Sequence, residues 1–427
     1  MKKMLEPLIN FLDRSPTPYH AAEQIETLLA EGDFTPLKEG EKWELEAGKG
    51  YFVTREGALV CAFRLPKNDP SHAVLLASHI DSPALKIKPQ PEMESLGVGR
   101  LGTESYGAPL LYSWLDRDLA IAGRIFVLNQ RGELEAKTVF LDDYPVIIPS
   151  VAIHLNREVN DKGLILQKEE HLRAITSIHS QKNHLEAWLK KHHPFQKVLS
   201  SDLFLVPLEK GAFVGFENEL IASYRLDNLT SAYAALVALL QSKGVKDRIQ
   251  MSIFWDHEEI GSKTHKGADS VFVSEILERI CQNYQMDKED FYRMKSRSLC
   301  LSCDVTHGYH PNYPEKYDVQ NAAILGKGPA IKFSARYATT GATAAPIIHL
   351  AEKKKIPIQT FTSRADLPSG GTVGAMMGAS SGIATLDLGI ACWSMHSIRE
   401  TIAAKDELLL VELLTAALNE PILRELE

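Results

Sequence analysis

The 427-residue sequence contains little cysteine, no excess of positive charge and no hydrophobic run long enough to span a membrane. Its five cysteines lack regular spacing, so they predict no disulfide framework. A formal net charge of -8 argues against a nucleic-acid partner, which requires a basic face. The longest apolar run, Ala232 to Leu240, is too short for a bilayer, and Glu6, Asp13 and Arg14 interrupt any signal-like segment. We therefore expect a cytoplasmic protein that binds neither membranes nor nucleic acid.

One cysteine pair has the CxxC spacing of redox and zinc motifs. Cys300 and Cys303 lie in Ser298–Cys303, an apolar run typical of a strand. Because side chains alternate along a strand, the two thiols should point to opposite faces of a sheet. We interpret them as buried core residues rather than as a redox or zinc pair.

The pattern of helices and strands predicts two domains, one of them interrupted. Residues 4–31 have apolar positions at helical spacing, divided at Ser15–Pro18, and residues 43–64 alternate as in a hairpin. Strand and helix patterns then continue from residue 224 to the end. Between them, residues 85–223 show short strand-like runs separated by Gly, Asn and Asp turns. We expect an α/β domain (residues 1–84 and 224–427) with a mostly parallel-type sheet and flanking helices, and a β-rich domain (85–223) inserted into it.

Metal-binding and acidic residues follow the predicted strands of the α/β domain directly. The stretch Met251–Ser262 changes from apolar residues to Asp-His-Glu-Glu, and the other strands end in the same kind of residue. The set is His79, Asp227, Glu258, Glu259, Asp304 and His396. Taken singly, each has a simpler explanation, such as a helix cap for Asp227 or a solvated loop for the glutamates. Since parallel strands end at one edge of a sheet, we expect these side chains to converge there.

So many carboxylates in one place require cations. Two histidines with several carboxylates suit a pair of zinc ions that share a bridging carboxylate and a bridging water. Asp81 follows His79 at a spacing of two, which fits a carboxylate that steadies a metal-binding histidine. Of two neighbouring glutamates, one can hold a metal while the other takes a proton from the water.

Five motifs also resemble the aspartyl aminopeptidase family of co-catalytic dizinc exopeptidases. They occur in the same order over nearly the whole chain: His-Ile-Asp-Ser-Pro (79–83), Arg-Leu-Asp-Asn (225–228), His-Glu-Glu-Ile-Gly-Ser (257–262), Asp304 with His310-Pro-Asn, and Met-His-Ser-Ile-Arg-Glu (395–400). His257 stands where the family often has Asn. The resemblance implies a zinc exopeptidase-like fold and two zinc ions per subunit, with cobalt or manganese as possible substitutes.

The resemblance also implies a role for each residue. His79, Asp304 and a bridging Asp227 would hold one metal, and Asp227, Glu259 and His396 the other. Glu258 would be the general base, and Asp81 would orient His79.

The resemblance implies that the inserted domain forms dimers that assemble into a dodecamer. It also implies roles for two residues in other matching segments. His154, in Ile148–Leu155, would enter a neighbouring subunit's active site and steady the tetrahedral oxyanion. Lys332 would face an acidic substrate side chain; a solvated strand lysine is the alternative.

The predicted function is a metalloaminopeptidase that removes an N-terminal residue, Asp or Glu, from peptides with a free N-terminus. Relatives differ in side-chain preference, so neutral or broad specificity is one alternative. A related dizinc amidohydrolase or carboxypeptidase is another, with Arg364 as the cation for a substrate carboxylate. A non-catalytic assembly protein is the third, although both glutamates and all the proposed ligands are present.

Overall fold

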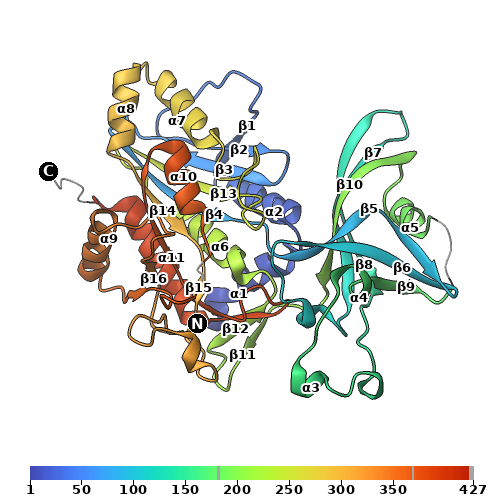
Figure 1. Cartoon of the computed structure of the whole chain (residues 1–427). Coiled ribbons are helices and arrows are strands. Elements are labelled where there is room, and N and C mark those ends of the chain that lie inside the picture. The colour runs from blue at the N-terminus through green and yellow to red at the C-terminus, as the bar shows by residue number, and fades with distance from the viewer. Residues whose placement is uncertain (180–182, 368–369, 423–427) are drawn as a thin grey trace.

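The structure is a computed structural model that describes residues 1–179, 183–367 and 370–422. It has two parts that lie side by side (Figure 1). We call residues 1–83 and 208–422 the α/β body, and residues 84–207 the β-rich body. None of the described helices combines the length and the apolar character needed to cross a bilayer.

A nine-stranded sheet forms the centre of the α/β body. Its order is β1 (Phe34–Leu37), β2 (Gly50–Arg55), β3 (Leu59–Arg64), β13 (Arg248–Trp255), β4 (His72–His79), β14 (Leu299–Cys303), β18 (Ala384–Gly389), β16 (Ala330–Lys332) and β17 (Gln359–Phe361). The four middle strands, β13, β4, β14 and β18, are mutually parallel. Trp255 at the end of β13 pairs with His79 at the end of β4, so the chain leaves both strands at the same edge. The mostly parallel α/β sheet agrees with the prediction.

Helices cover both faces of this sheet (Figure 1). On one face lie α1 (Lys2–Asp13), α2 (Pro18–Glu31), α6 (Leu226–Gln241), α9 (Gly341–Lys354) and α11 (Ala404–Asn419); on the other lie α7 (Phe272–Asn283), α8 (Lys288–Ser296) and α10 (Val373–Ser381). Cys303 belongs to the first core and Cys300 to the second, and both thiols are buried and free. The prediction that these cysteines are core residues on opposite faces is confirmed.

The β-rich body contains a six-stranded antiparallel sheet. Its order is β8 (Leu134–Val146), β7 (Leu119–Leu128), β10 (Lys197–Pro207), β5 (Ala84–Ser95), β6 (Val98–Tyr106) and β9 (Ala174–Ser177). Short helices join the strands: η1 (Leu111–Trp114), η2 (Ile153–Leu155), α3 (Val159–Lys162), α4 (Lys168–His171) and α5 (His184–His192). Strands β5, β7 and β10 contribute to a separate apolar core that includes Trp114.

A third, five-stranded sheet belongs to the α/β body. It comprises β11 (Ala212–Val214), β12 (Leu220–Ser223), β20 (Glu400–Ala403), β19 (Ala391–Trp393) and β15 (Thr306–His307), and the short helix η3 (Pro314–Lys316) follows β15. Because β12 pairs with β20, the segment that follows Pro207 has already returned to the α/β body. By this pairing β12 belongs with the third sheet, and the boundary of the inserted domain at residue 223 stays a prediction. This third sheet delivers the chain to Asp227 and carries His396 in the turn between β19 and β20.

Candidate active site

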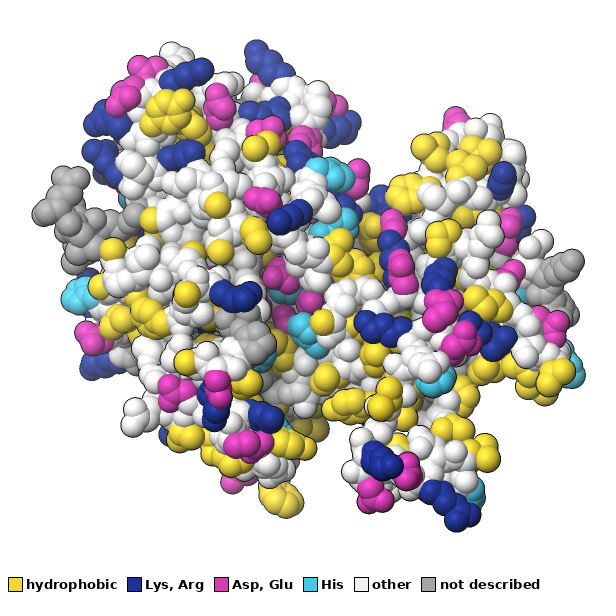
Figure 2. All heavy atoms as spheres, in the orientation of Figure 1, with side chains coloured by type: hydrophobic (Ala, Val, Ile, Leu, Met, Phe, Trp, Pro, Cys, Tyr) yellow, Lys and Arg dark blue, Asp and Glu magenta, His cyan; other side chains and the backbone are white. Residues whose placement is uncertain are grey.

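His79, the two glutamates and Asp304 follow strands of the nine-stranded sheet and meet at one edge of it, as expected. Asp227 and His396 reach the same place from the third sheet, so the prediction that they too follow strands of the parallel sheet is wrong. Figure 2 shows acidic and histidine side chains gathered in the hollow between the two bodies. His79 Nε2 lies 3.4 Å from Asp227 Oδ1 and 3.7 Å from Asp304 Oδ1. His396 Nε2 lies 3.3 Å from Asp227 Oδ2 and 3.7 Å from Glu259 Oε1. The carboxylate of Asp227 thus presents one oxygen to each histidine.

Two groups of side chains have the composition and spacing of metal sites. His79, Asp227 and Asp304 form one group, and Asp227, Glu259 and His396 form the other. Within each group, the potential ligand atoms lie within 4.8 Å of one another. Asp227 belongs to both groups. A third overlapping group joins His79 with Glu258 and Glu259.

Backbone carbonyls set the orientation of both histidines. His79 Nδ1 lies 3.1 Å from the carbonyl oxygen of Asp81, and His396 Nδ1 lies 3.1 Å from that of Ala108. Because a carbonyl only accepts hydrogen bonds, each Nδ1 carries the hydrogen. Each Nε2 can then offer its lone pair to a cation, the arrangement found at metal-binding histidines.

The Asp81 carboxylate bonds the backbone of Glu258 and Glu259. Its Oδ1 accepts a hydrogen bond from the backbone N–H of Glu258 (3.1 Å), and its Oδ2 accepts one from that of Glu259 (3.1 Å). Asp81 Oδ1 also lies 3.4 Å from His79 Nδ1. One buried carboxylate therefore connects a histidine of the first group with both glutamates.

Two residues of the site have no counterpart in the prediction. Glu400 is buried and accepts hydrogen bonds from the backbone N–H of Asp227 (2.8 Å) and of His396 (2.6 Å). Tyr106, from the β-rich body, donates a hydrogen bond to Asp81 Oδ2 (2.8 Å). Glu400 lies in the matched 395–400 motif, so its position was a signal. Nothing in the local sequence around Tyr106 indicated its contact.

The electrostatics of the site demand positive charge. Burial disfavours a charged imidazole, yet Asp227, Asp304 and Asp81 raise the pKa of His79 well above its usual value. Burial likewise opposes protonation of His396, but Asp227 and Glu259 raise its pKa to about 10. Burial, together with Asp227, raises the pKa of Glu259 well above its ordinary value. Metal cations at these places would meet the same demand without protons.

Two oxygens of the site lack a hydrogen-bond partner. Within residues 1–179, 183–367 and 370–422, no donor reaches Asp227 Oδ1 or Glu259 Oε1, and both atoms are buried. A buried carboxylate oxygen without a donor is unfavourable unless it coordinates a metal. The residues therefore fit metal ions in both groups.

Burial raises the pKa of Glu258 to about 7, and Asp304, Asp81 and Asp227 contribute to the rise while His79 opposes it. A carboxylate with such a pKa can both accept and return a proton near neutral pH.

The other three predicted residues, Lys332, His154 and Arg364, differ in their exposure and in their contacts. Lys332 is buried, so it is not a solvated strand lysine. Its ammonium donates to the backbone oxygen of Val305 (2.7 Å) and lies 3.4 Å from Asp304 Oδ2. His154 is exposed in η2 of the β-rich body. Arg364 forms a two-pronged pair with Asp366, at 2.9 and 2.6 Å.

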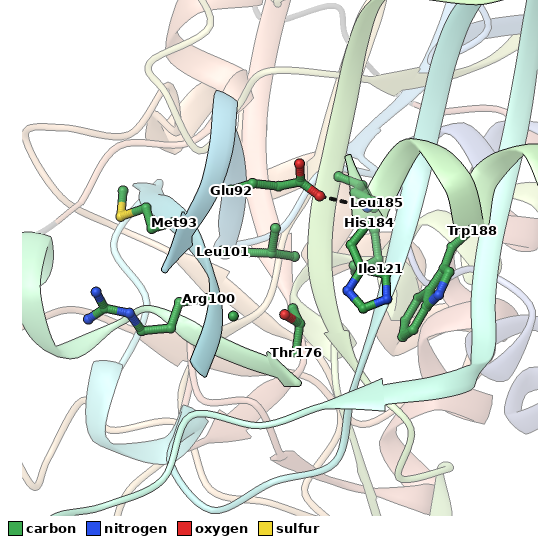
Figure 3. A pocket seen from close by; sticks show the side chains of 10 residues that line it. Glu92, Met93, Arg100, Leu101, Ile121, Thr176, His184, Leu185 and Trp188 are labelled. Atoms are coloured by element: carbon green, nitrogen blue, oxygen red, sulfur yellow. Dashed lines mark hydrogen bonds between the residues drawn. The ribbon is translucent and has the colours of Figure 1, made fainter. Parts of the chain in front are cut away.

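A cavity in the β-rich body is separate from these groups (Figure 3). It has a volume of about 20 Å³, and its lining includes Glu92, Arg100 and Trp188. The carboxylate of Glu92 already accepts a hydrogen bond from the backbone N–H of Leu185 (2.8 Å). A cavity of this size holds about one water molecule, so it is no substrate site.

The fold and the strand-end cluster define a zinc exopeptidase-like metallohydrolase. Comparison with known families agrees: the model of the aminopeptidase I zinc metalloprotease family (M18) matches residues 11–417. The chain belongs to this family, and it is a zinc-dependent aminopeptidase.

Similar proteins cover almost the entire chain. A probable M18 family aminopeptidase 2 of Ectopseudomonas mendocina is 36% identical over 431 residues, which cover 98% of this chain and 99% of the relative. Among solved structures, the cryo-EM structure of the Ape4 and Nbr1 complex has a TM-score of 0.93 and 31% identity, and the match covers 98% of this chain and 85% of that one. The yeast mApe1 dodecamer has a TM-score of 0.85 and 27% identity, with coverage of 97% and 96%.

Proposed function

We propose that this M18 aminopeptidase holds two metal ions per subunit and removes an N-terminal Asp or Glu from peptides, with Glu258 as general base. The observation that carries the proposal is Asp227, whose two oxygens face His79 and His396 at 3.4 and 3.3 Å. A carboxylate placed in this way is suited to bridge two ions, each completed by its own histidine and carboxylate. When bound, zinc ions supply a Lewis acid for the substrate carbonyl and lower the pKa of water.

Glu258 is the residue suited to move the proton. Its backbone N–H is held by Asp81, while Glu259 beside it belongs to a ligand group. The Glu258 carboxylate takes a proton from the attacking water and returns it to the nitrogen of the leaving amine.

The preference for an acidic first residue rests on cationic groups beside the site. A cavity of about 220 Å³ adjoins β15, and Lys316 lines it together with the acidic Asp318. The Lys332 ammonium has three donors, of which Val305 and Asp304 occupy two. The ammonium also lies 5.6 Å from the centre of the Tyr337 ring, and a substrate carboxylate would have to approach it beside Asp304. A carboxypeptidase is less well supported, because Arg364 is already paired with Asp366.

We further propose that the β-rich body, our candidate for the inserted domain, mediates dimers that assemble into a dodecamer; the structure of the similar mApe1 is a dodecamer. Large apolar side chains are exposed around η2, where His154 lies: Val151, Ile153, Leu155 and Ile165. Burial of these side chains against a second copy would place His154 at a subunit boundary. In that position it can donate a hydrogen bond to the oxyanion of a neighbouring site.

Metal analysis combined with a substrate panel tests the proposal. We expect two zinc ions per subunit at saturation and loss of hydrolysis when a chelator removes them. Aspartyl and glutamyl amides should be cleaved faster than leucyl and alanyl amides, and N-acetyl-aspartyl amide should not be cleaved. A single zinc ion at saturation would contradict the two-metal site, and faster cleavage of leucyl amide would contradict the acidic preference.

A further inference from the structure

A short segment of the β-rich body contacts both proposed metal groups. This segment, residues 106–110, follows β6 and reaches across to the α/β body; we call it the strap. We propose that the strap positions the ligands of both metal groups, with Tyr106 as a positioning residue for the first and Gly107 for the second. The inference concerns the arrangement of ligands and rests on the proposed two-metal function.

Tyr106 acts on the first group through Asp81. Its hydroxyl donates to Asp81 Oδ2 at 2.8 Å, and the same oxygen accepts the backbone N–H of Glu259. The Tyr106 ring packs edge-on against Phe204 of β10, with the ring centroids 5.6 Å apart. The hydroxyl is thus held by the β-rich core at one end and fixes Asp81 at the other. Asp81 in turn contacts the Nδ1 atom of His79.

The next residues of the strap act on the second group directly. The backbone oxygen of Ala108 accepts from His396 Nδ1, and the backbone N–H of Leu110 donates to the oxygen of His396 at 2.9 Å. Both ends of this ligand residue are therefore bonded to the strap. Since outer partners of a metal-binding histidine fix its ring, the strap determines where His396 Nε2 points.

Gly107 allows the strap to pass close to Glu259. It has a φ of +67°, and a methyl group at its Cα would lie 3.1 Å from both Cβ and Oε2 of Glu259. Side chains other than glycine are strained at this φ, and the contact is tighter than ordinary van der Waals packing. A larger residue here must displace either the strap or the Glu259 carboxylate.

Zinc affinity tests the inference without relying on activity. Metal-free protein is titrated with zinc against a fluorescent zinc chelator, and each variant has a matched control. Tyr106→Phe removes only the hydroxyl and should weaken binding at one of the two sites about 10-fold or more. Tyr224→Phe is its control, since the buried Tyr224 hydroxyl donates to the backbone oxygen of Pro83 (2.7 Å) and not to a carboxylate. This control should bind zinc like the wild type.

Gly107→Ala tests the second group and is compared with Gly132→Ala. Gly132 is in the same body and has a φ of +77°, but the described residues leave open space within 4 Å of the added methyl. Both variants carry the backbone strain, and only Gly107→Ala meets a ligand. We expect Gly107→Ala to weaken zinc binding and Gly132→Ala to bind zinc like the wild type.

The outcomes separate this inference from the proposed function. Wild-type zinc affinity at both sites in Tyr106→Phe and in Gly107→Ala would overturn the role of the strap. If Tyr106→Phe does not fold, the Gly107 and Gly132 pair decides. A wild type that binds one zinc would contradict the two-metal function, and weakened binding of that ion in either strap variant would still support the strap.

Discussion

The α/β body and the β-rich body differ in what they bury and what they expose. The α/β body buries charged groups at its strand ends, including His79, Asp81, Asp227 and Glu400. Among the described residues from 84 to 207, the buried side chains are aliphatic or aromatic apart from Thr103. Both bodies expose some large apolar side chains, but those of the β-rich body include a group around η2, with Leu155 and Ile165 at 80% and 83%.

This difference indicates different constraints on the two bodies. Buried charges destabilise a fold unless they are paired or bind metals, so a cluster of them marks a functional site. Exposed apolar side chains in a body with an ordinary core mark an interaction surface. The strap is the described segment of the β-rich body that takes part in the charged cluster.

The largest expected effect is a loss of kcat in the α/β body, compared with a loss of stability alone in the β-rich body. Glu258→Gln removes the proposed base but keeps the size of the side chain, and should lower kcat about 10²–10⁴-fold while zinc content is unchanged. Thr103→Val in the β-rich body loses a hydrogen bond to the backbone oxygen of Leu172 (2.8 Å), which costs about 1 kcal/mol of stability. This control should melt slightly earlier with unchanged kcat. Equal loss of kcat in both variants would remove the functional distinction between the bodies.

An intermediate effect concerns assembly. Replacing Leu155 and Ile165 together by serine should reduce the oligomer, measured by sedimentation velocity, because the apolar surface that drives association is lost. Leu96→Ser, at a fully exposed leucine in the β5–β6 turn, should leave the oligomer intact. An unchanged assembly in the double variant would place the subunit interface elsewhere.

The smallest expected effect is a pH dependence at the junction of the bodies. Burial, with a contribution from Arg225, lowers the pKa of His20 in α2 to about 4, and its ring lies 6.1 Å from that of Phe140 in β8. The unfolded chain binds a proton to this histidine below about pH 6.5, whereas the folded chain does not until about pH 4. Stability is therefore lost as the pH falls through this range, by about 2 kcal/mol between pH 7 and pH 5.

Urea unfolding at the two pH values measures this effect, with His20→Gln as the comparison. The variant should lose that part of the pH dependence. If the free energy of unfolding changes equally with pH in wild type and variant, His20 is not the source of the pH dependence.

The sequence was most informative where function and secondary structure coincide. His79, Asp304 and the glutamate pair directly follow parallel strands, so the rule that such strands end at one edge was enough to bring them together. Hydrophobic alternation also placed Cys300 and Cys303 on opposite faces. These inferences depend on short stretches of sequence.

Contacts between distant segments were not predictable in this way. Tyr106 and Asp81 meet because the strap crosses between the bodies, and no periodicity encodes that crossing. The inserted segment was expected to end at residue 223 because β11 and β12 have the same short, alternating texture as the strands before them. Lys332 was expected to be either a solvated strand lysine or a substrate contact. Because β16 lies inside the sheet between β18 and β17, Lys332 is buried and the first alternative is wrong.

The order of the ligands along the chain has a consequence for biosynthesis. The proposed ligands extend from His79 to His396, and each proposed metal requires residues from separate segments. A growing chain that has not yet released the β19–β20 turn from the ribosome lacks His396 and cannot complete the second group. Each copy of the enzyme is thereby expected to complete its second ligand group only when almost all of its own chain has been synthesised.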